Sequence, residues 1–221
     1  MAVDYEVVYV RNEGQLFEVS EKLSCSSAIA FDCEGINLGR HGPLTIATFG
    51  TLEKNSPIYV VDVQVLGGDK VFSESNALKE LLEGEVPKIM FDCRAESDAL
   101  FHQFGVRLNG VLDMQIMDQA TRIYLRGEAV PQRCEYLCPT FIPRLPNMDA
   151  VAKRSGLSII TKLPCPHLFS SSVWSKRPLD PKTIAYAAQD VHVIREMQSS
   201  STCQSPKRWQ VPIVLIPSIF G

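Results

Sequence analysis

The sequence predicts an α/β fold, and two observations carry that prediction. Three strand-like segments joined by short loops occur early in the chain, at 28–35, 44–50 and 58–63, and their short connections favour an antiparallel meander. From residue 88 onward the pattern changes to alternating strands and helices, which is typical of α/β architecture. The segments of this second part are expected at 88–92, 94–104, 111–113 and 114–125.

Local signals predict the remaining elements. Residues 5–10 are rich in β-branched and aromatic side chains, which favour a strand. Asn12 is a good N-cap for the helix that follows, because its side chain can accept a hydrogen bond from the first turn. The last helix is expected over 180–197, since proline is well tolerated in a first turn. Shorter helices are expected from residue 75 and over 147–154, with a long proline-containing loop at 127–146 and a polar loop through 170–174.

Amino-acid composition and net charge limit the functions that the chain can have. The chain has 221 residues, of which 45% are hydrophobic and 21% charged, as is usual for a globular protein with a substantial core. Its formal net charge of −3 excludes a globally basic nucleic-acid binder. Any nucleic-acid binding must therefore use local basic patches and bound cations.

Seven cysteines, an odd and scattered set, argue against a disulfide framework and for a reducing compartment. The residues Cys134, Cys138, Cys165 and His167 could be read as a zinc set, but their spacing matches no common finger. Buried thiols are the favoured interpretation.

We expect a single domain over residues 1–198 and an irregular tail over 199–221. The acidic residues Asp4 and Glu6 argue against a signal peptide, and no apolar run reaches the length of about 18 residues that spans a membrane. Cytoplasmic or nuclear localisation, or both, is expected. The tail is apolar over 211–220 but interrupted by prolines, which fits an ill-packed end, a docking strand or a segment that binds protein partners.

The apolar segment 28–35 ends in two carboxylates one residue apart, Asp32 and Glu34. Successive side chains of a strand alternate between faces, so both carboxylates point the same way. Such a pair repels itself unless a cation lies between, and hard divalent cations prefer carboxylate oxygens. The alternative is a strand that runs out into a polar turn.

The last predicted helix carries a second polar pair, Tyr186 and Asp190. These residues are four apart, so they share one face of the helix, distinct from the apolar stripe of Ala187, Val191 and Ile194. Alone they would be an ordinary surface pair. Opposite Asp32 and Glu34, Asp190 would be a third metal carboxylate and the Tyr186 hydroxyl could orient a water molecule.

These motifs, in this order, resemble the DEDDy class of 3′-5′ exonucleases, which includes RNase D and the Werner-type exonuclease. The resemblance rests on Phe31-Asp32-Cys33-Glu34-Gly35, an acid in the helix after 88–92, and Tyr186-Ala187-Ala188-Gln189-Asp190. The run Trp174-Ser175-Lys176-Arg177-Pro178-Leu179 is similar to the corresponding RNase D segment. The first motif and Asp92-Cys93-Arg94 look closest to the branch that contains Egalitarian and its animal exonuclease-domain relatives. The resemblance covers roughly residues 25–195.

The resemblance implies a ribonuclease H-like fold, with a mixed sheet of five or six strands flanked by helices. It also implies two Mg²⁺ or Mn²⁺ ions held by four acids, which hydrolyse a phosphodiester at the 3′ end of a nucleic acid and release nucleoside 5′-monophosphates. Three of the acids would be Asp32, Glu34 and Asp190, and Tyr186 would position the attacking water. A single-stranded substrate is expected, with RNA favoured.

The fourth acid is where the chain departs from the class. The class has an Asp nine residues before the glycine that ends this helix, and counting back from Gly105 leads to Glu96. Asp98 is the alternative, but it lies about 200° further round the helix, so both cannot face the site. Glu96 is one methylene longer than Asp, and a misplacement of about 1 Å can cost roughly a hundredfold in rate. A second hypothesis is therefore a weak or inactive nuclease fold that serves as an RNA-binding or protein-interaction adaptor.

Candidate nucleic-acid contacts flank the two motifs. Ile36 and Asn37 follow the first acid pair and would lie beside the terminal base, where an apolar residue could stack. Basic residues are candidate phosphate contacts, although each could equally be an ordinary solvated side chain. They are Arg40, Lys162, Lys176 and Arg177.

Overall fold

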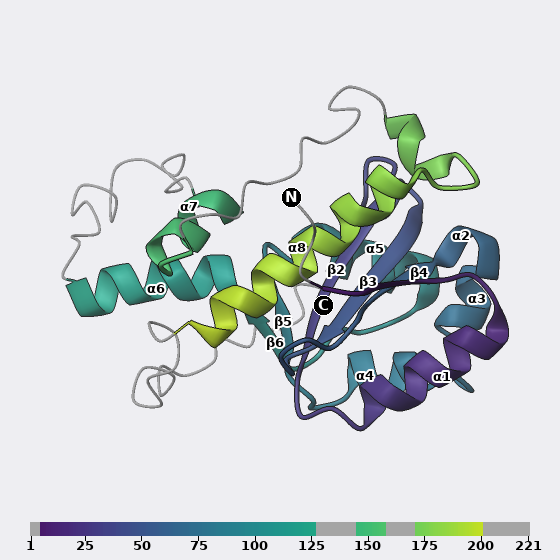
Figure 1. Cartoon of the computed structure of the whole chain (residues 1–221), viewed down its shortest axis with the longest axis horizontal. Coiled ribbons are helices and arrows are strands. Elements are labelled where there is room, and N and C mark those ends of the chain that lie inside the picture. The colour runs from purple at the N-terminus through teal and green to yellow at the C-terminus, as the bar shows by residue number, and fades with distance from the viewer. Residues whose placement is uncertain (1–4, 127–144, 158–170, 201–221) are drawn as a thin grey trace.

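A six-stranded mixed sheet forms the centre of the computed structural model, which describes residues 5–126, 145–157 and 171–200 (Figure 1). The strand order is β1-β4-β3-β2-β5-β6. The predicted meander is confirmed, because β3 pairs antiparallel with both β2 and β4, while β1, β5 and β6 join in parallel. The strands are β1 Val7–Val10, β2 Ile29–Gly35, β3 Leu44–Thr51, β4 Ile58–Asp62, β5 Lys88–Met90 and β6 Val111–Asp113.

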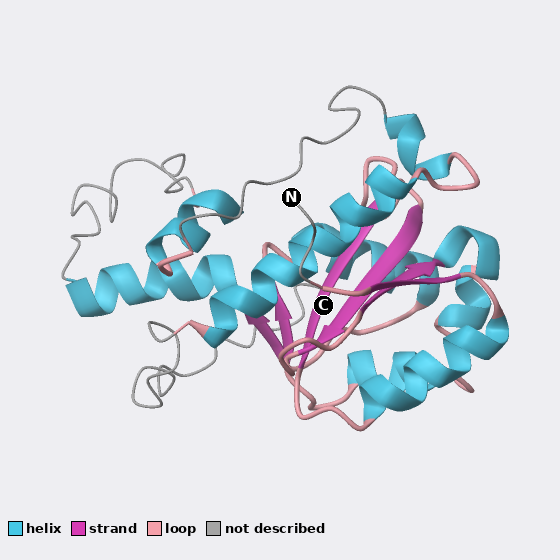
Figure 2. Ribbon diagram, in the orientation of Figure 1, coloured by secondary structure: helices cyan, strands magenta, loops and turns pink. Residues whose placement is uncertain are grey.

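Helices cover both faces of the sheet (Figure 2). Along β2, Ile29, Phe31 and Cys33 pack into the cluster formed with α1, α4 and α5, whereas Ala30 packs into the cluster formed with α8. The two faces follow from the strand period of two. The helices are α1 Glu13–Ser24, α2 Val63–Leu66, α3 Gly68–Val71, α4 Ala77–Glu83, α5 Arg94–Phe104, α6 Met114–Arg126, α7 Met148–Arg154 and α8 Pro181–Ser199, with the 3₁₀ helix η2 at Ser171–Ser175.

Most predicted helix starts are confirmed by their caps. The side chains of Asn12, Asn147 and Asp180 accept hydrogen bonds from the first turns of α1, α7 and α8. The helix expected from residue 75 begins two residues later, because Asn76 is its cap. Sequence reasoning missed the short α2 and α3, and η2 replaces part of the expected polar loop. The strand expected to reach residue 63 stops at Asp62, which caps α2.

Several expectations concern residues outside the described part of the chain. These are most of the loop at 127–146, the cysteines and histidine of the alternative zinc set, Lys162, and the tail from residue 201. Within the described part, no helix combines the length and the apolar character that crossing a bilayer requires.

A buried ion pair connects the sheet to the segment that precedes α8. The guanidinium of Arg177 donates to both carboxylate oxygens of Asp62, from Nε at 2.6 Å and from Nη2 at 2.7 Å. Asp62 is fully buried at the end of β4 and also accepts a hydrogen bond from the hydroxyl of Tyr9. Arg177 donates in addition to the carbonyl of Trp174 at 2.9 Å. One ion pair therefore holds β1, β4 and the Trp174 turn together.

We expect Asp62→Ala to lower the free energy of unfolding by about 3–5 kcal/mol, because it leaves the Arg177 charge buried without its partner. Urea unfolding followed by circular dichroism measures this. Lys70→Ala is the control, since it removes the exposed ion pair between Lys70 and Glu13 and should change little. An Asp62→Ala protein as stable as the control would show that the pair does not hold the fold.

Candidate active site

The first acid pair lies on the central strand β2. This strand is hydrogen-bonded to β3 on one side and β5 on the other, so its alternation of side chains is fixed. Asp32 and Glu34 project from the face that α8 covers, opposite Thr48 and Ile46 of β3. Asp32 is only 8% exposed, and Glu34 is half-buried. The sheet thus holds two carboxylates side by side beneath a helix.

The third acid comes from α8, which runs across this face of the sheet (Figure 1). The helix buries Ala187, Val191 and Ile194 against the strands, and this packing turns Asp190 toward β2. One carboxylate oxygen from each of Asp32, Glu34 and Asp190 lies within 4.8 Å of the others. We call these three residues the acidic triad. The structure therefore brings together three acids that are far apart in sequence.

Tyr186 lies one helical turn before Asp190 on α8. Its half-buried ring packs near the buried ring of Trp174, with 6.1 Å between the centroids and an interplanar angle of 52°. The indole belongs to the turn that the Arg177–Asp62 pair holds in place. This arrangement restricts the Tyr186 ring from the side opposite to solvent.

Glu96 is buried in the first turn of α5, at 7% exposure, but it is not part of the acidic triad. It shares a helix face with Ala99 and Leu100, which pack into the cluster on the far side of the sheet from α8. Its Oε2 atom has no hydrogen-bond partner among the described residues. Burial raises the pKa of the Glu96 carboxyl to about 7. A hydrogen bond from its own backbone N–H lowers this pKa, and the negative charges of Asp92 and Asp113 raise it.

The thiol of Cys33 lies within electrostatic reach of both Glu96 and the acid pair. Burial raises the pKa of Cys33 well above its ordinary value, and the negative charges of Glu96, Asp32 and Glu34 raise it further. Cys33 projects from β2 on the α5 side, opposite to its two neighbours. Glu96 and the acid pair thus share one neutral neighbour, the Cys33 thiol.

Asp113 is a residue of this region that the sequence analysis did not single out. It is buried at the end of β6 and accepts hydrogen bonds from the backbone N–H groups of Asp92 at 3.2 Å, Cys93 at 3.1 Å and Gln115 at 2.9 Å. These contacts fix the turn that leads into α5, where Asp92 has a φ of +57°. Asp113 therefore helps to set where α5 begins, and with it the position of Glu96 in the first turn. An Asp between a short strand and a helix is an N-cap signal, which could have identified it.

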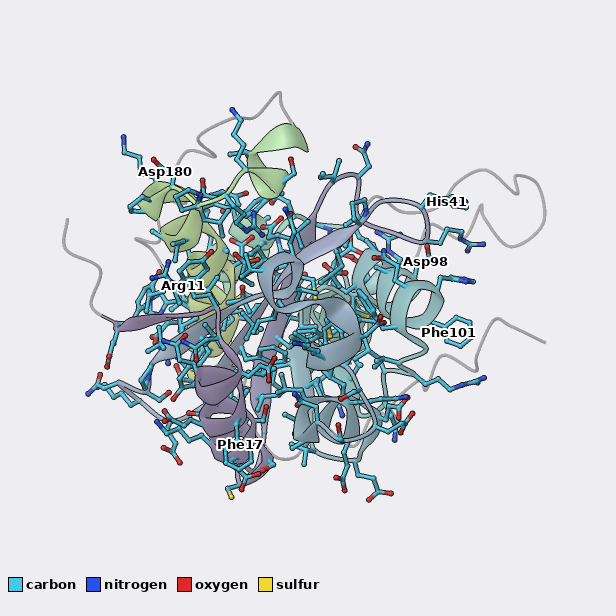
Figure 3. The ribbon with its side chains drawn as sticks, turned by 90° about the vertical axis from the view of Figure 1, so that its right-hand side faces the viewer. Arg11, Phe17, His41, Asp98, Phe101 and Asp180 are labelled. Atoms are coloured by element: carbon cyan, nitrogen blue, oxygen red, sulfur yellow. The ribbon has the colours of Figure 1, made fainter. Side chains whose placement is uncertain are left out.

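Asp98, the alternative fourth acid, faces the loop that follows β2. It accepts hydrogen bonds from the Arg40 backbone N–H at 2.7 Å and from Arg40 Nη2 at 2.9 Å. The His102 ring also lies near it, with Nε2 at 3.6 Å from Asp98 Oδ1. Figure 3 shows Asp98 on α5 beside the loop that carries His41. Asp98 and Glu96 therefore point to different surroundings, as their helical separation predicts.

The other predicted contacts lie on the loop after β2 and on the turn before α8. Ile36 is partly buried against the α8-side cluster, and Asn37 is exposed with a φ of +50°. Lys176 is exposed on the turn before α8. Arg177 is instead largely engaged in the ion pair with Asp62, with its side chain 16% exposed.

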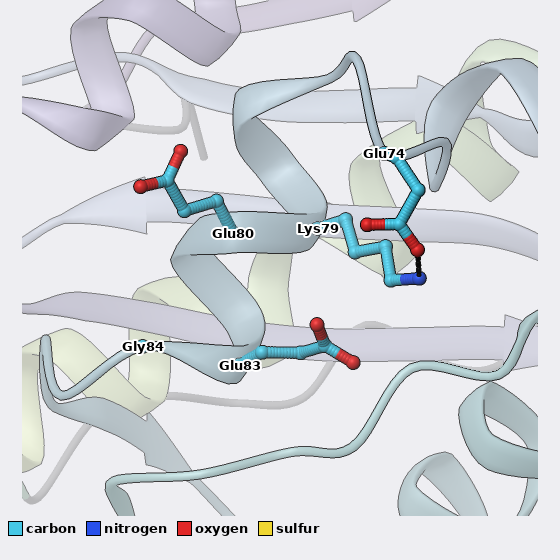
Figure 4. Close-up of a pocket in the computed structure, with 5 residues that line it drawn as sticks. All are labelled: Glu74, Lys79, Glu80, Glu83 and Gly84. Atoms are coloured by element: carbon cyan, nitrogen blue, oxygen red, sulfur yellow. Dashed lines mark hydrogen bonds and ion pairs between the residues drawn. The ribbon is translucent and has the colours of Figure 1, made fainter.

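A cavity of about 380 Å³ lies elsewhere, over α4 (Figure 4). Its lining consists of Glu74, Lys79, Glu80, Glu83 and Gly84, and Lys79 forms an ion pair with Glu74. None of the triad residues contributes to it. The candidate active site is therefore the carboxylate cluster beneath α8, not this cavity.

Comparison with known proteins agrees with this geometry. The sequence model of a 3′-5′ exonuclease family matches residues 7–200. The piRNA biogenesis protein EXD1 of Xenopus laevis is 30% identical over 180 residues, which cover 80% of this chain and 38% of that protein. The chain spans less than half the length of the curated relatives it matches.

Solved structures show the same fold. Trypanosoma brucei RNase D superposes with a TM-score of 0.73 at 24% identity, covering 90% of this chain and 66% of that one. The complex of that enzyme with RNA U12 gives a TM-score of 0.69 at 25% identity, covering 89% and 62%. The predicted ribonuclease H-like sheet is thus confirmed. With the family match over residues 7–200, the chain belongs to the 3′-5′ exonuclease family and is RNase D-like.

Proposed function

We propose that this protein is a metal-dependent 3′-5′ exonuclease that removes nucleotides from the 3′ end of single-stranded RNA. The observation that carries the proposal is the acidic triad, in which three carboxylates lie within 4.8 Å of one another beneath Tyr186. A binding surface for phosphates has no use for such concentrated negative charge unless cations neutralise it.

The residues present fit divalent metal ions. The triad supplies only oxygen ligands, which Mg²⁺ and Mn²⁺ prefer, and Asp32 and Asp190 are nearly buried. The buried Glu96 oxygen without a described partner is a further donor, near the Cys33 thiol that also neighbours the acid pair. Asp32, Glu34, Asp190 and Glu96 are the proposed ligands for two ions. When bound, such ions activate water and neutralise charge on the phosphate under attack.

The other side chains take roles around these ligands. The Tyr186 hydroxyl positions the attacking water, with its ring supported by Trp174. Ile36 stacks against the terminal base, and Asn37 contacts the same nucleotide. Arg40, Lys176 and the exposed edge of Arg177 attract the phosphates, which gives local positive charge to a chain of net charge −3. Water attacks the phosphorus of the last phosphodiester and its P–O3′ bond breaks, which releases a nucleoside 5′-monophosphate and leaves a 3′-hydroxyl on the shortened strand.

RNA is the favoured substrate because the relatives of this chain are associated with RNA. The T. brucei structure is a complex of RNase D with RNA U12, and the Xenopus relative is a piRNA biogenesis protein. Both relatives are associated with RNA. The path of the strand would run from the 36–43 loop, across the triad, toward Lys176.

The placement of Glu96 favours a second candidate function. Glu96 stands outside the acidic triad, so the fourth proposed ligand is not clustered with the other three. A fold with a weak or inactive site could serve as an RNA-binding or protein-interaction adaptor. Activity measurements separate this candidate from the enzyme.

We expect the protein to shorten a 3′-extended single-stranded RNA in Mn²⁺ or Mg²⁺, and not in EDTA. Asp32→Ala should abolish shortening because it removes one of the three clustered carboxylates, while Glu80→Ala on α4 serves as the distant acidic control. Denaturing gels of 5′-labelled RNA give the rate. Intact RNA in Mn²⁺ together with retained RNA binding would support the adaptor and contradict the enzyme.

The identity of the fourth acid makes a separate prediction. Glu96→Gln should lower kcat in Mn²⁺ by roughly a hundredfold, the scale of a misplaced catalytic group. Asp98→Asn should lower it far less, because Asp98 contacts Arg40 rather than the triad. Single-turnover rates on the same RNA provide the comparison. The reverse order of effects would assign the fourth position to Asp98.

The metal-free protein should lose stability as pH rises toward neutrality. The folded pKa of Glu96 is about 7, above the unfolded value near 4.5, so the folded state holds the proton more tightly. The stabilisation is complete below about pH 4.5 and is lost as pH rises through 7, by on the order of 3 kcal/mol. Urea unfolding in EDTA at pH 5 and 7.5 measures it against Glu96→Gln. An equal pH dependence in both proteins would mean that Glu96 does not carry this proton.

A further inference from the structure

The loop over residues 36–43 is folded so tightly that parts of its backbone touch. A Cβ atom on Gly42 would lie 2.0 Å from the Asn37 carbonyl oxygen, and one on Gly35 would lie 2.3 Å from that of Pro43. Asn37 also has a φ of +50°, which few side chains other than Asn tolerate. The loop therefore has one compact conformation, and glycine is required at both close approaches.

Helix α5 holds this compact loop from outside through Gln103. The side-chain amide donates to the carbonyls of Gly39 at 2.7 Å and Gly42 at 2.9 Å, while its oxygen accepts from the Leu44 N–H at 3.1 Å. Glutamine supplies both donors and an acceptor in one group. One side chain therefore links Leu44, the first residue of β3, to the loop backbone at Gly39 and Gly42.

A second contact from the same helix holds the tip of the loop. Asp98 accepts from the Arg40 backbone N–H at 2.7 Å and pairs with the Arg40 guanidinium. Asp98 and Gln103 lie on one helix, five residues apart, and contact the same loop from Gly39 to Leu44. The helix that begins near Glu96 thus also places the loop.

The loop starts two residues after Glu34, so its position decides what stands next to the acidic triad. Ile36 packs on the α8 side and Leu38 on the α5 side, so the loop wraps around the end of the sheet. Asn37 and Arg40 are exposed on it. Their place relative to the triad depends on the contacts of the loop with α5.

We propose that Gln103, assisted by Asp98, is a positioning residue that fixes the 36–43 loop for the 3′-terminal nucleotide of the substrate. The inference rests on the proposed function. In this proposal α5 has two roles, because the helix carries Glu96 in its first turn and holds the 36–43 loop through Gln103 in its last turn. Gln103 touches neither substrate nor metal ligand and acts through the loop backbone alone.

The test replaces Gln103 with Met, which has nearly the same shape but cannot make the three hydrogen bonds. Losing these bonds should loosen the loop and weaken the affinity for a fluorescent 12-nucleotide RNA by about tenfold or more. Fluorescence anisotropy in Ca²⁺ measures binding, and amide hydrogen exchange measures opening of the loop. Gln15→Met on α1 is the matched control, because Gln15 accepts from Arg11 far from the loop.

We expect Gln103→Met to speed exchange over 36–43 while exchange in β2 stays near that of the control. Faster exchange throughout the molecule would show a general structural role and overturn the proposal. Faster loop exchange with unchanged RNA affinity would also overturn it. A wild-type protein that neither binds nor shortens RNA would instead contradict the proposed function, and the exchange data would still report on how the loop is held.

Discussion

The mutual repulsion of three carboxylates is the constraint on which this structure depends. Like charges about 4.8 Å apart repel by roughly 3 kcal/mol per pair at an effective dielectric constant near 20. Nothing in an apolar core would gather Asp32, Glu34 and Asp190 spontaneously. The scaffold must therefore impose the arrangement, and a bound cation is the natural way to relieve it. Most features of the fold around the triad can be understood as ways of keeping these three groups in place.

The scaffold does this with elements that leave little freedom. β2 is paired on both sides, so Asp32 and Glu34 cannot move to the other face without breaking a ladder of hydrogen bonds. α8 is held by its apolar stripe against several strands, which fixes Asp190 in rotation. The Arg177–Asp62 pair fixes the turn before α8. Repulsion between the acids is thus opposed by packing and pairing spread over the whole sheet.

Sequence reasoning was most successful where the signal is local. The period of two along β2 and the spacing of four along α8 place three acids correctly, because those periods do not depend on tertiary structure. The meander and the capped helices were predicted for the same reason. The position of Glu96 relative to the acidic triad could not be predicted, since it depends on how Asp113 sets the turn before α5. Arg177 looked like a surface cation, and only the folded structure reveals the buried Asp62 beside it.

Whether Glu96 serves as the fourth metal ligand determines whether this chain has the complete site that the proposed chemistry requires. It is buried, acidic and close to Cys33, yet it lies outside the acidic triad. The most direct measurement is anomalous X-ray diffraction from crystals soaked in Mn²⁺. The account predicts one manganese peak bound by Asp32, Glu34 and Asp190, and a second bound by Glu96. A crystal at millimolar Mn²⁺ without any peak at the acidic triad would contradict it.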